Sequence, residues 1–177
     1  MPARTRPIVL EDAPRIAALQ AANRAFLAPW DAIRPDVFYT VPGQETEVRR
    51  LLQRHEEGSA LGHAILDDDG ALVGVIRLTD VVRGAFESCS MGYWVAQEAN
   101  GRGYASEAVA SITAVAFGEL GLHRVEASTL LHNARSQRVL AKNGFERIGT
   151  APQYLRIAGE WQDHALFQLL APATVSR

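Results

Sequence analysis

Two glycines flank an arginine in Gly101-Arg102-Gly103, where a hydrophobic stretch ends and a helical pattern begins. Glycine lets the backbone approach a ligand closely and turn without strain from a Cβ atom. The N–H groups in the first turn of a helix have no partner within the helix, and with the positive end of the helix dipole they favour a phosphate. Arg102 would add a charged contact. The spacing therefore predicts an anion site at this junction.

Two common phosphate-binding motifs match this loop poorly. It is not a Walker loop, because it lacks the four-residue spacer and the Lys-Ser/Thr pair. Gly101 and Gly103 match part of a dinucleotide fingerprint, but Ser106 stands where the third glycine belongs. A dinucleotide domain usually also opens with this unit, whereas here about half of the chain precedes it. A tight strand–helix turn that binds no ligand is the remaining alternative.

The pattern after the loop predicts an amphipathic helix that ends near Gly118 and Gly121. Apolar residues recur at the three-four spacing of one buried face; they are Ala105, Ala108, Val109, Ile112, Val115 and Ala116. The small residues at its start allow the helix to lie close to a sheet or to a ligand.

Composition limits the classes of protein that the chain fits. Its 177 residues suit one domain with a real core, over residues 1–177. A net charge of −2 argues against nucleic acid as a partner. The single cysteine, Cys89, excludes an intrachain disulfide framework and argues against a cysteine-based metal site, and we expect it to be a small core or edge residue and not a nucleophile. No apolar run is long enough to span a membrane, and no signal core follows the N-terminus. We expect a cytoplasmic protein. The sequence does not decide whether the protein forms a homodimer.

The hydrophobic patterns predict a mixed α/β sheet with helices on both faces. The predicted strands cover Thr5–Leu10, which Pro7 places at an edge, then Ala60–Leu66, Leu72–Thr79, Phe86–Val95, His123–Thr129, Glu146–Thr150 and Trp161–Leu170. The predicted helices run from a cap at Asp12 to about Arg24, from Thr46 to Glu57, and from a cap at Asn133 to Gly144, with Pro42-Gly43 as a turn. Asp67-Asp68-Asp69-Gly70 is expected to be a solvated hairpin turn, not a cation site. The helix between the fourth and fifth strands implies a right-handed crossover and a parallel pair.

The motifs together resemble the GCN5-related N-acetyltransferases (GNAT). That family has the core pattern Gln/Arg-x-x-Gly-x-Gly/Ala, which Asn100 to Ala105 fits at Gly103 and Ala105 and departs from at Asn100. Asn133-x-x-Ser136-x-Arg138-Val139-Leu140 looks like the family's second coenzyme-binding segment. The ending from Tyr154 to His164 is similar to the RimJ/RimL branch, and to RimJ more than RimL. The resemblance covers nearly the whole chain.

The resemblance implies the GNAT fold, with a mostly antiparallel sheet and a splayed parallel pair, and acetyl-CoA as cosubstrate without a metal. The pantetheine arm would lie in the gap between the splayed strands. Backbone N–H groups near Trp94 or Val95 would polarise the thioester oxygen, and those of Arg102 to Ala105 would hold the pyrophosphate. The coenzyme-binding residues implied in this way are Trp94, Val95, Asn100, Gly101, Arg102, Gly103, Tyr104, Ala105, Asn133 and Ser136.

Direct acetyl transfer to an amine needs a base, oxyanion donors and a proton for the leaving thiolate. The resemblance suggests Ser136 for protonating the thiolate; the alternative is a first-turn residue that interacts with Asn133. Many relatives have a Glu where this chain has Ser90, so the base is left open. Glu126 is the candidate base, with a structural ion pair as the alternative. Asp163-His164 is a weaker candidate pair, because adjacent strand residues point to opposite faces.

The acceptor is the least determined part of the prediction. Trp30, Tyr93, Tyr154 and Trp161 are candidates for the walls of an acceptor pocket, and each would otherwise be core. The branch acetylates the N-terminal amines of ribosomal proteins, so a protein N-terminus is the first predicted acceptor. A small amine such as a polyamine or an antibiotic is the alternative, and a non-catalytic acyl-CoA sensor is the third. An open groove would favour the first and a closed acidic pocket the second.

Overall fold

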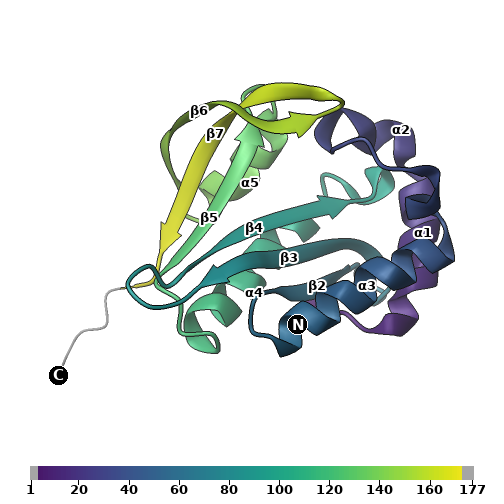
Figure 1. Ribbon diagram of the computed structural model, residues 1–177, viewed down its shortest axis with the longest axis horizontal. Coiled ribbons are helices and arrows are strands. Elements are labelled where there is room, and N and C mark those ends of the chain that lie inside the picture. Colours follow the sequence, from purple (N-terminus) through teal and green to yellow (C-terminus); the bar gives the residue numbers. More distant parts are fainter. Residues whose placement is uncertain (1–3, 173–177) are drawn as a thin grey trace.

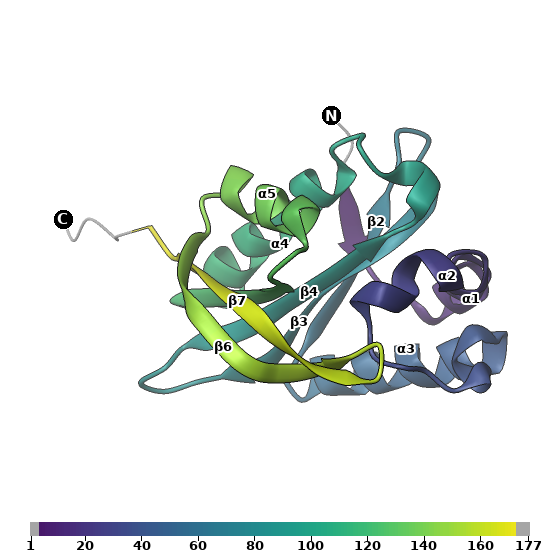
Figure 2. The ribbon, with the colours of Figure 1, turned by 90° about the horizontal axis from the view of Figure 1, so that it is seen from above.

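A computed structural model describes residues 4–172, which form one twisted seven-stranded sheet with helices on both faces (Figures 1 and 2). The strands are β1 (Thr5–Pro7), β2 (Leu61–Leu66), β3 (Leu72–Val82), β4 (Ser88–Val95), β5 (Arg124–Leu130), β6 (Glu146–Ile157) and β7 (Glu160–Leu170). Their order across the sheet is β1-β2-β3-β4-β5-β7-β6. Only β4 and β5 pair in parallel, and all other neighbours are antiparallel. The predicted mixed sheet with one parallel pair is confirmed.

The helices divide between the two faces of the sheet, as Figure 2 shows. They are α1 (Ala13–Ala22), α2 (Arg24–Leu27), α3 (Val41–Glu56), α4 (Tyr104–Gly118) and α5 (Ala134–Lys142), with short 3-10 turns at Leu10–Asp12, Ala28–Trp30, Asp36–Tyr39 and Gln97–Ala99. One core lies between the sheet and α4, and a second between the sheet and α1 and α3. The predicted face of α4 is confirmed, since Ala108, Val109, Ile112 and Ala116 are fully buried. None of the described helices is long and apolar enough to cross a membrane.

The parallel pair separates partway along β4. Its register with β5 runs from Ser88 opposite Arg124 to Met91 opposite Ala127 and ends there. The remaining residues of β4, Gly92 to Val95, pair only with β3, and Figure 1 shows the two strands diverging from their common end. The edge of β4 that faces β5 is therefore free over its last residues.

Two local predictions were wrong. Pro42-Gly43 is not a turn but lies in the first turn of α3, which begins five residues earlier than predicted. Proline suits this position because its missing N–H has no helical partner there, and the Thr40 hydroxyl accepts from the Gly43 N–H at 3.2 Å. Asp12 makes no side-chain cap to α1; its carboxylate binds Arg6 at 2.7 Å and the Val9 N–H at 2.9 Å.

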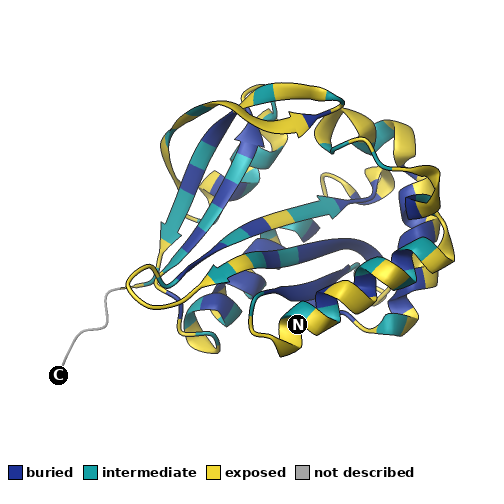
Figure 3. Ribbon diagram, viewed as in Figure 1, coloured by how far each residue is buried: buried dark blue, intermediate teal, exposed yellow. Residues whose placement is uncertain are grey.

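Other elements have the predicted type but begin or end at different residues than predicted. The predicted first strand ends at Pro7, at the sheet edge as expected. The last two strands form a longer hairpin than predicted, because β6 continues to Ile157 past an irregularity between Ala151 and Leu155. Most of β6 is exposed (Figure 3). Cys89 is a core residue, and burial raises the pKa of its thiol to about 12, which makes it a poor nucleophile.

His63 on β2 gives the fold a pH dependence. Its side chain is buried, its Nδ1 lies 3.2 Å from the Thr5 hydroxyl, and burial first and the nearby His55 second lower its pKa to about 4. In the unfolded chain the His63 imidazole takes up a proton near pH 6.5. The contribution of His63 to stability is therefore full above that pH and is lost as the pH falls towards 4. We expect the loss to reach about 3 kcal/mol from this group.

Urea unfolding at pH 7 and pH 4.5 measures this loss. The His63→Leu variant should lose less stability between the two pH values than the wild type. The matched control, His123→Gln, replaces an exposed histidine and should retain the wild-type difference. An unchanged difference in His63→Leu would contradict the assignment.

Candidate active site

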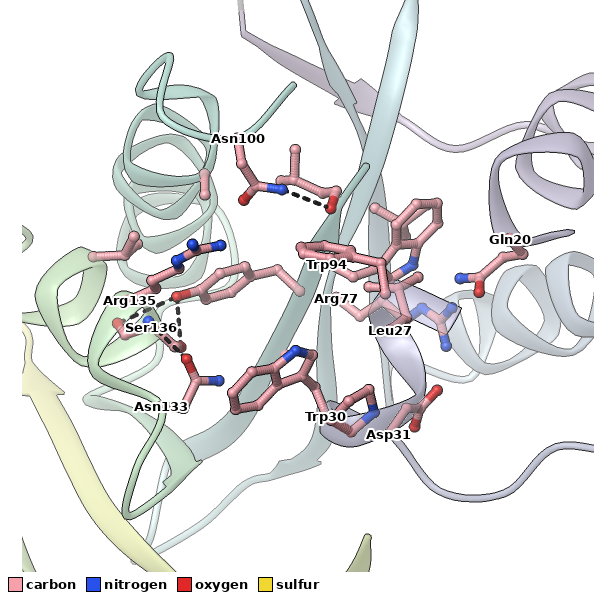
Figure 4. A pocket seen from close by; sticks show the side chains of 18 of the residues that line it. Gln20, Leu27, Trp30, Asp31, Arg77, Trp94, Asn100, Asn133, Arg135 and Ser136 are labelled. Carbon is pink, nitrogen blue, oxygen red and sulfur yellow. Dashed lines mark hydrogen bonds between the residues drawn. The ribbon is translucent and has the colours of Figure 1, made fainter. Parts of the chain in front are cut away.

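An open cleft of about 1020 Å³ passes through the gap beside the free end of β4. It has walls on both faces of the sheet, because successive residues of β4 point to opposite sides. Tyr93 and Val95 pack towards α4 and α5, whereas Trp94 packs towards the core under α1 and α3. Figure 4 shows the two sides, with Asn133, Arg135 and Ser136 on one and Gln20, Leu27 and Arg77 on the other. A ligand on one side can therefore reach a ligand on the other through the gap.

The free edge of β4 supplies backbone donors to this gap. The Ala96 N–H donates to the Val73 carbonyl on β3 at 2.9 Å, and in an antiparallel pair such groups alternate between the two edges. The N–H groups of Tyr93 and Val95 consequently point away from β3, and that of Trp94 points towards it. Of the two residues predicted to polarise a carbonyl oxygen, Val95 is the one whose N–H faces the gap.

The glycine loop takes the geometry predicted for an anion site. Gly101 and Gly103 have φ values of 80° and 90°, which L-residues with a side chain rarely adopt. α4 begins directly after Gly103, and its first helical bond runs from the Glu107 N–H to the Gly103 carbonyl at 3.0 Å. The N–H groups of the preceding turn lie at the positive end of a 15-residue helix without intrahelical partners. A phosphate fits this turn.

Two predicted coenzyme residues brace the loop with their side chains. The Asn100 side-chain amide donates to the Ala96 carbonyl at 2.9 Å and to the Gln97 carbonyl at 3.3 Å. Tyr104 is 2% exposed, and its hydroxyl donates to Asp68 at 2.9 Å. Arg4 binds both Asp68 and Glu107, so the first strand and the β2–β3 turn hold the start of α4. Tyr104 can therefore serve an anion through its backbone only.

Ser136 is the centre of a hydroxyl pair at the coenzyme side of the gap. Its Oγ lies 2.9 Å from the phenol oxygen of Tyr93, and its N–H donates to the Asn133 side chain at 3.1 Å. Burial raises the pKa of Tyr93 to about 12, while the bond with Ser136 opposes that rise, so the phenol keeps its proton at neutral pH. The cap of α5 uses only the backbone N–H of Ser136. The hydroxyl of Ser136 takes no part in the cap and is available for proton transfer. Tyr93, predicted as a wall of the acceptor pocket, thus lies beside Ser136.

Trp30 lines the other side of the cleft and is 38% exposed. Its ring lies 5.4 Å from the ring of His132, which precedes α5. The two rings therefore span the opening of the cleft between the Ala28–Trp30 turn and α5. Trp94 lines the same side. Its indole Nε1 is buried without a hydrogen-bond partner among the described residues.

Three residues predicted as the base or as acceptor walls do not line the cleft. Tyr154 and Trp161 lie on the outer hairpin, 46% and 62% exposed, and Tyr154 packs on His164 with ring centroids 5.7 Å apart. Glu126 lies on β5 within the paired part of the parallel strands, 3.5 Å from Arg124. The loop residues Gly101, Arg102, Gly103 and Tyr104 lie beside the cleft at the start of α4, whereas Asn100 and Ala105 line it.

We expect Glu126→Gln to keep kcat/KM for the best acceptor within about threefold of the wild type, because general bases act within hydrogen-bond reach of the proton they accept. The pH dependence of kcat/KM should also be unchanged. Steady-state kinetics between pH 6 and 9 measures both. A loss of two orders of magnitude or more would make Glu126 the base and contradict its structural placement.

Arg77 and the partnership of Tyr93 with Ser136 did not emerge from the sequence. Arg77 is a charged residue within the otherwise apolar stretch Leu72–Leu78 of β3, and this is the signal that could have marked it. No signal in the sequence joins Tyr93 to Ser136, because they are 43 positions apart and meet only in the folded chain. Within residues 4–172, no group of three or more His, Cys, Asp or Glu side chains is placed to hold a metal ion.

Comparisons with known proteins agree with this geometry. The acetyltransferase (GNAT) domain matches residues 4–146. The [ribosomal protein uS5]-alanine N-acetyltransferase of Escherichia coli is 36% identical over 162 residues, which are 91% of this chain and 84% of that protein. The structure of RimJ from Mycobacterium smegmatis in complex with CoA-disulfide superposes with a TM-score of 0.90 at 32% identity, over 94% of this chain and 81% of that one. The ribosomal-protein-S5-alanine acetyltransferase of Vibrio fischeri gives 0.89 at 31% identity, over 94% and 91%.

The matched region contains the free edge of β4, the glycine loop and the hydroxyl pair of Ser136. The chain belongs to the GNAT family of N-acetyltransferases.

Proposed function

We propose that the protein transfers the acetyl group of acetyl-CoA directly to the α-amine at the N-terminus of a protein, with ribosomal proteins as the acceptor class. The relatives that are named for acting on ribosomal protein S5 support this class of acceptor. The observation that carries the proposal is the open cleft, whose acceptor side has no unpaired carboxylate among the described residues.

The coenzyme side of the cleft fits acetyl-CoA. The N–H groups at the start of α4 suit a pyrophosphate, and the left-handed conformations of Gly101 and Gly103 bring that backbone into place. Arg135 and Arg138 line the same side and add positive charge. The gap beside Val95 is where an extended arm would reach the free edge of β4. The RimJ structure from Mycobacterium smegmatis, in complex with CoA-disulfide, supports the same ligand here.

The charges on the acceptor side argue against polycationic acceptors. Asp31 is the single carboxylate among the lining residues that the structure describes, and Arg34 pairs with it at 3.1 Å. Arg77 adds a second positive charge to the same side. Polyamines and aminoglycosides carry several positive charges and would be repelled. A peptide N-terminus presents one amine, and the open cleft leaves room for the chain behind it.

The chain's own groups can supply each proton step. A free α-amine has a pKa of about 8, so a substantial share is already neutral near pH 8, and water in the open cleft can accept its proton. The Val95 N–H stabilises negative charge on the reacting carbonyl oxygen. The Ser136 hydroxyl donates to the departing sulfur, the Tyr93 phenol passes its proton to Ser136, and water in the open cleft, which took the proton of the amine, returns one to Tyr93. One proton leaves the amine and one reaches the sulfur, so the protein is unchanged after each turnover.

A thiol-release assay with a panel of acceptors tests this function. The panel holds peptides that begin with Ala, Ser or Met, and beside them polyamines, aminoglycosides and free amino acids, each with acetyl-CoA and purified protein. We expect turnover of the peptides, with a preferred first residue. Turnover of small amines alone would overturn the protein acceptor, and coenzyme binding without any turnover would favour the sensor.

A further inference from the structure

The acceptor side of the cleft contains one guanidinium that has no partner. Arg77 lines the cleft from β3, and no hydrogen bond or ion pair joins its side chain to another residue in 4–172. By contrast, Arg34 on the same side is paired with Asp31 at 3.1 Å. Burial is the main cause that lowers the pKa of Arg77, and the charge of Arg34 lowers it further, while Glu47 and Asp31 raise it. Arginine nevertheless stays charged in proteins, so this cation is held partly buried without a hydrogen-bonded or ion-paired partner among residues 4–172.

The space in front of Arg77 is open. Arg77 lies opposite Gly92 in the β3–β4 register, and both residues line the acceptor side. A Cβ atom added at Gly92 would meet nothing within 4 Å. The missing side chain therefore leaves room beside the guanidinium for part of an acceptor.

Two further polar groups in this region lack partners. The Trp94 Nε1 is buried and makes no hydrogen bond, and it can act only as a donor. The Gln20 side chain is 5% exposed, lines the cleft, and makes no hydrogen bond within the described chain. Figure 4 shows Gln20, Trp94 and Arg77 on the side of the cleft away from Ser136. Buried polar groups usually have partners, so the unpaired donors of Arg77 and Trp94, beside a Gln20 amide that can donate as well as accept, indicate a ligand group that accepts hydrogen bonds.

We propose that Arg77, with Gln20 and the Trp94 indole, binds a carboxylate in the first residues of the acceptor peptide, which makes the enzyme selective for acidic N-terminal segments. This inference rests on the proposed function, because it takes the acceptor to be a peptide. A guanidinium pairs with a carboxylate through two parallel hydrogen bonds, and such charge-assisted bonds are stronger than those to a neutral carbonyl.

The spacing along the sheet indicates which peptide residue carries the carboxylate. Arg77 is opposite Gly92, and Val75 is opposite Trp94, so the Arg77 position lies two residues along the strand from the reacting edge at Trp94–Val95. Two strand positions span about 7 Å, and an extended peptide covers the same distance in about two residues. With the amine of residue 1 at the free edge of β4, the side chain of residue 2 or 3 reaches Arg77.

Matched peptides that begin with Ala and differ only as Glu or Gln at residue 2 or 3 test this inference. For the wild type we expect kcat/KM for the better-placed Glu peptide to exceed that for the matched Gln peptide by about 10- to 100-fold, the size expected for a hydrogen bond between charged groups. Most of this difference should lie in a lower KM. Arg77→Gln should abolish the preference and leave KM for acetyl-CoA unchanged. Arg77→Lys should keep part of it, and Arg77→Glu should favour a matched Lys peptide. The control Arg50→Gln changes an exposed arginine on α3 and should behave as the wild type.

Peptide affinity measured by calorimetry on the CoA-loaded protein gives a second readout that does not depend on turnover. Tighter binding of the Glu peptide to the wild type, lost in Arg77→Gln, supports the inference. Equal binding and turnover of the Glu and Gln peptides, or a preference that survives Arg77→Gln, would overturn it. Turnover of small amines with none of any peptide would instead overturn the proposed function, and the two failures are therefore distinguishable.

Discussion

Replacing Ser136 with alanine is expected to lower kcat by about 100-fold, the lower range for removing a group that acts in proton transfer. The structure separates this effect from a loss of stability, because the cap of α5 uses the Ser136 N–H, which alanine keeps. The affinity for acetyl-CoA and the melting temperature should remain close to those of the wild type. Stopped-flow single-turnover kinetics, with calorimetry for the coenzyme, measures the three quantities.

Tyr93→Phe and the double variant complete this test. Tyr93→Phe removes the phenol 2.9 Å from Ser136 Oγ and should lower kcat by about tenfold. If the two hydroxyls act as one relay, the double variant loses little more than Ser136→Ala alone. Asn133→Ala is the structural comparison, since it removes the cap and should lower the melting temperature. Wild-type kcat in Ser136→Ala, or a loss explained by weaker coenzyme binding, would contradict the relay.

Replacing Gly103 with valine is expected to weaken acetyl-CoA binding by about tenfold or more. Gly103 has a φ of 90° directly before α4, and a left-handed conformation costs an L-residue about 1–2 kcal/mol, more for a β-branched side chain. The variant therefore shifts the turn whose N–H groups face the phosphates. Calorimetric titration with CoA measures the loss, and kcat at saturating coenzyme should change little.

Gly118→Ala is the matched control for this substitution. Gly118 ends the same helix without a positive φ, and a Cβ atom there would meet nothing within 4 Å. Alanine at that position should leave coenzyme affinity unchanged and raise stability slightly. Equal affinities for Gly103→Val and Gly118→Ala would show that the loop does not hold the coenzyme.

Local patterns predicted the parts of the site that depend on neighbours in sequence. The glycine loop and the buried face of α4 follow from residue type and helical spacing, and so does the Asn133 cap. The parallel pair of β4 and β5 follows from the helix between them. Glycine torsions, caps and helix periodicity are set within a few residues, so no tertiary information was needed for these elements.

The walls of the cleft depend on contacts between distant segments. Tyr154 and Trp161 were expected beside the acceptor, but the register of β6 and β7 leaves them exposed outside the cleft. A shift of one residue in a strand turns each side chain to the other face, and β6 has two irregularities that sequence patterns do not reveal. The charge of Arg77 within an apolar stretch marks the residue, but only the fold shows which side of the cleft it lines.

The most direct test of the central claim is to find where the acetyl group is placed. A peptide with a free N-terminus and an internal lysine, incubated with the protein and acetyl-CoA, can be read by tandem mass spectrometry. We predict one acetyl group, on the α-amine of the first residue, and none on the same peptide with a blocked N-terminus. Acetylation of the lysine side chain, or of neither amine while a small-molecule amine is acetylated, would contradict a protein N-terminal acetyltransferase.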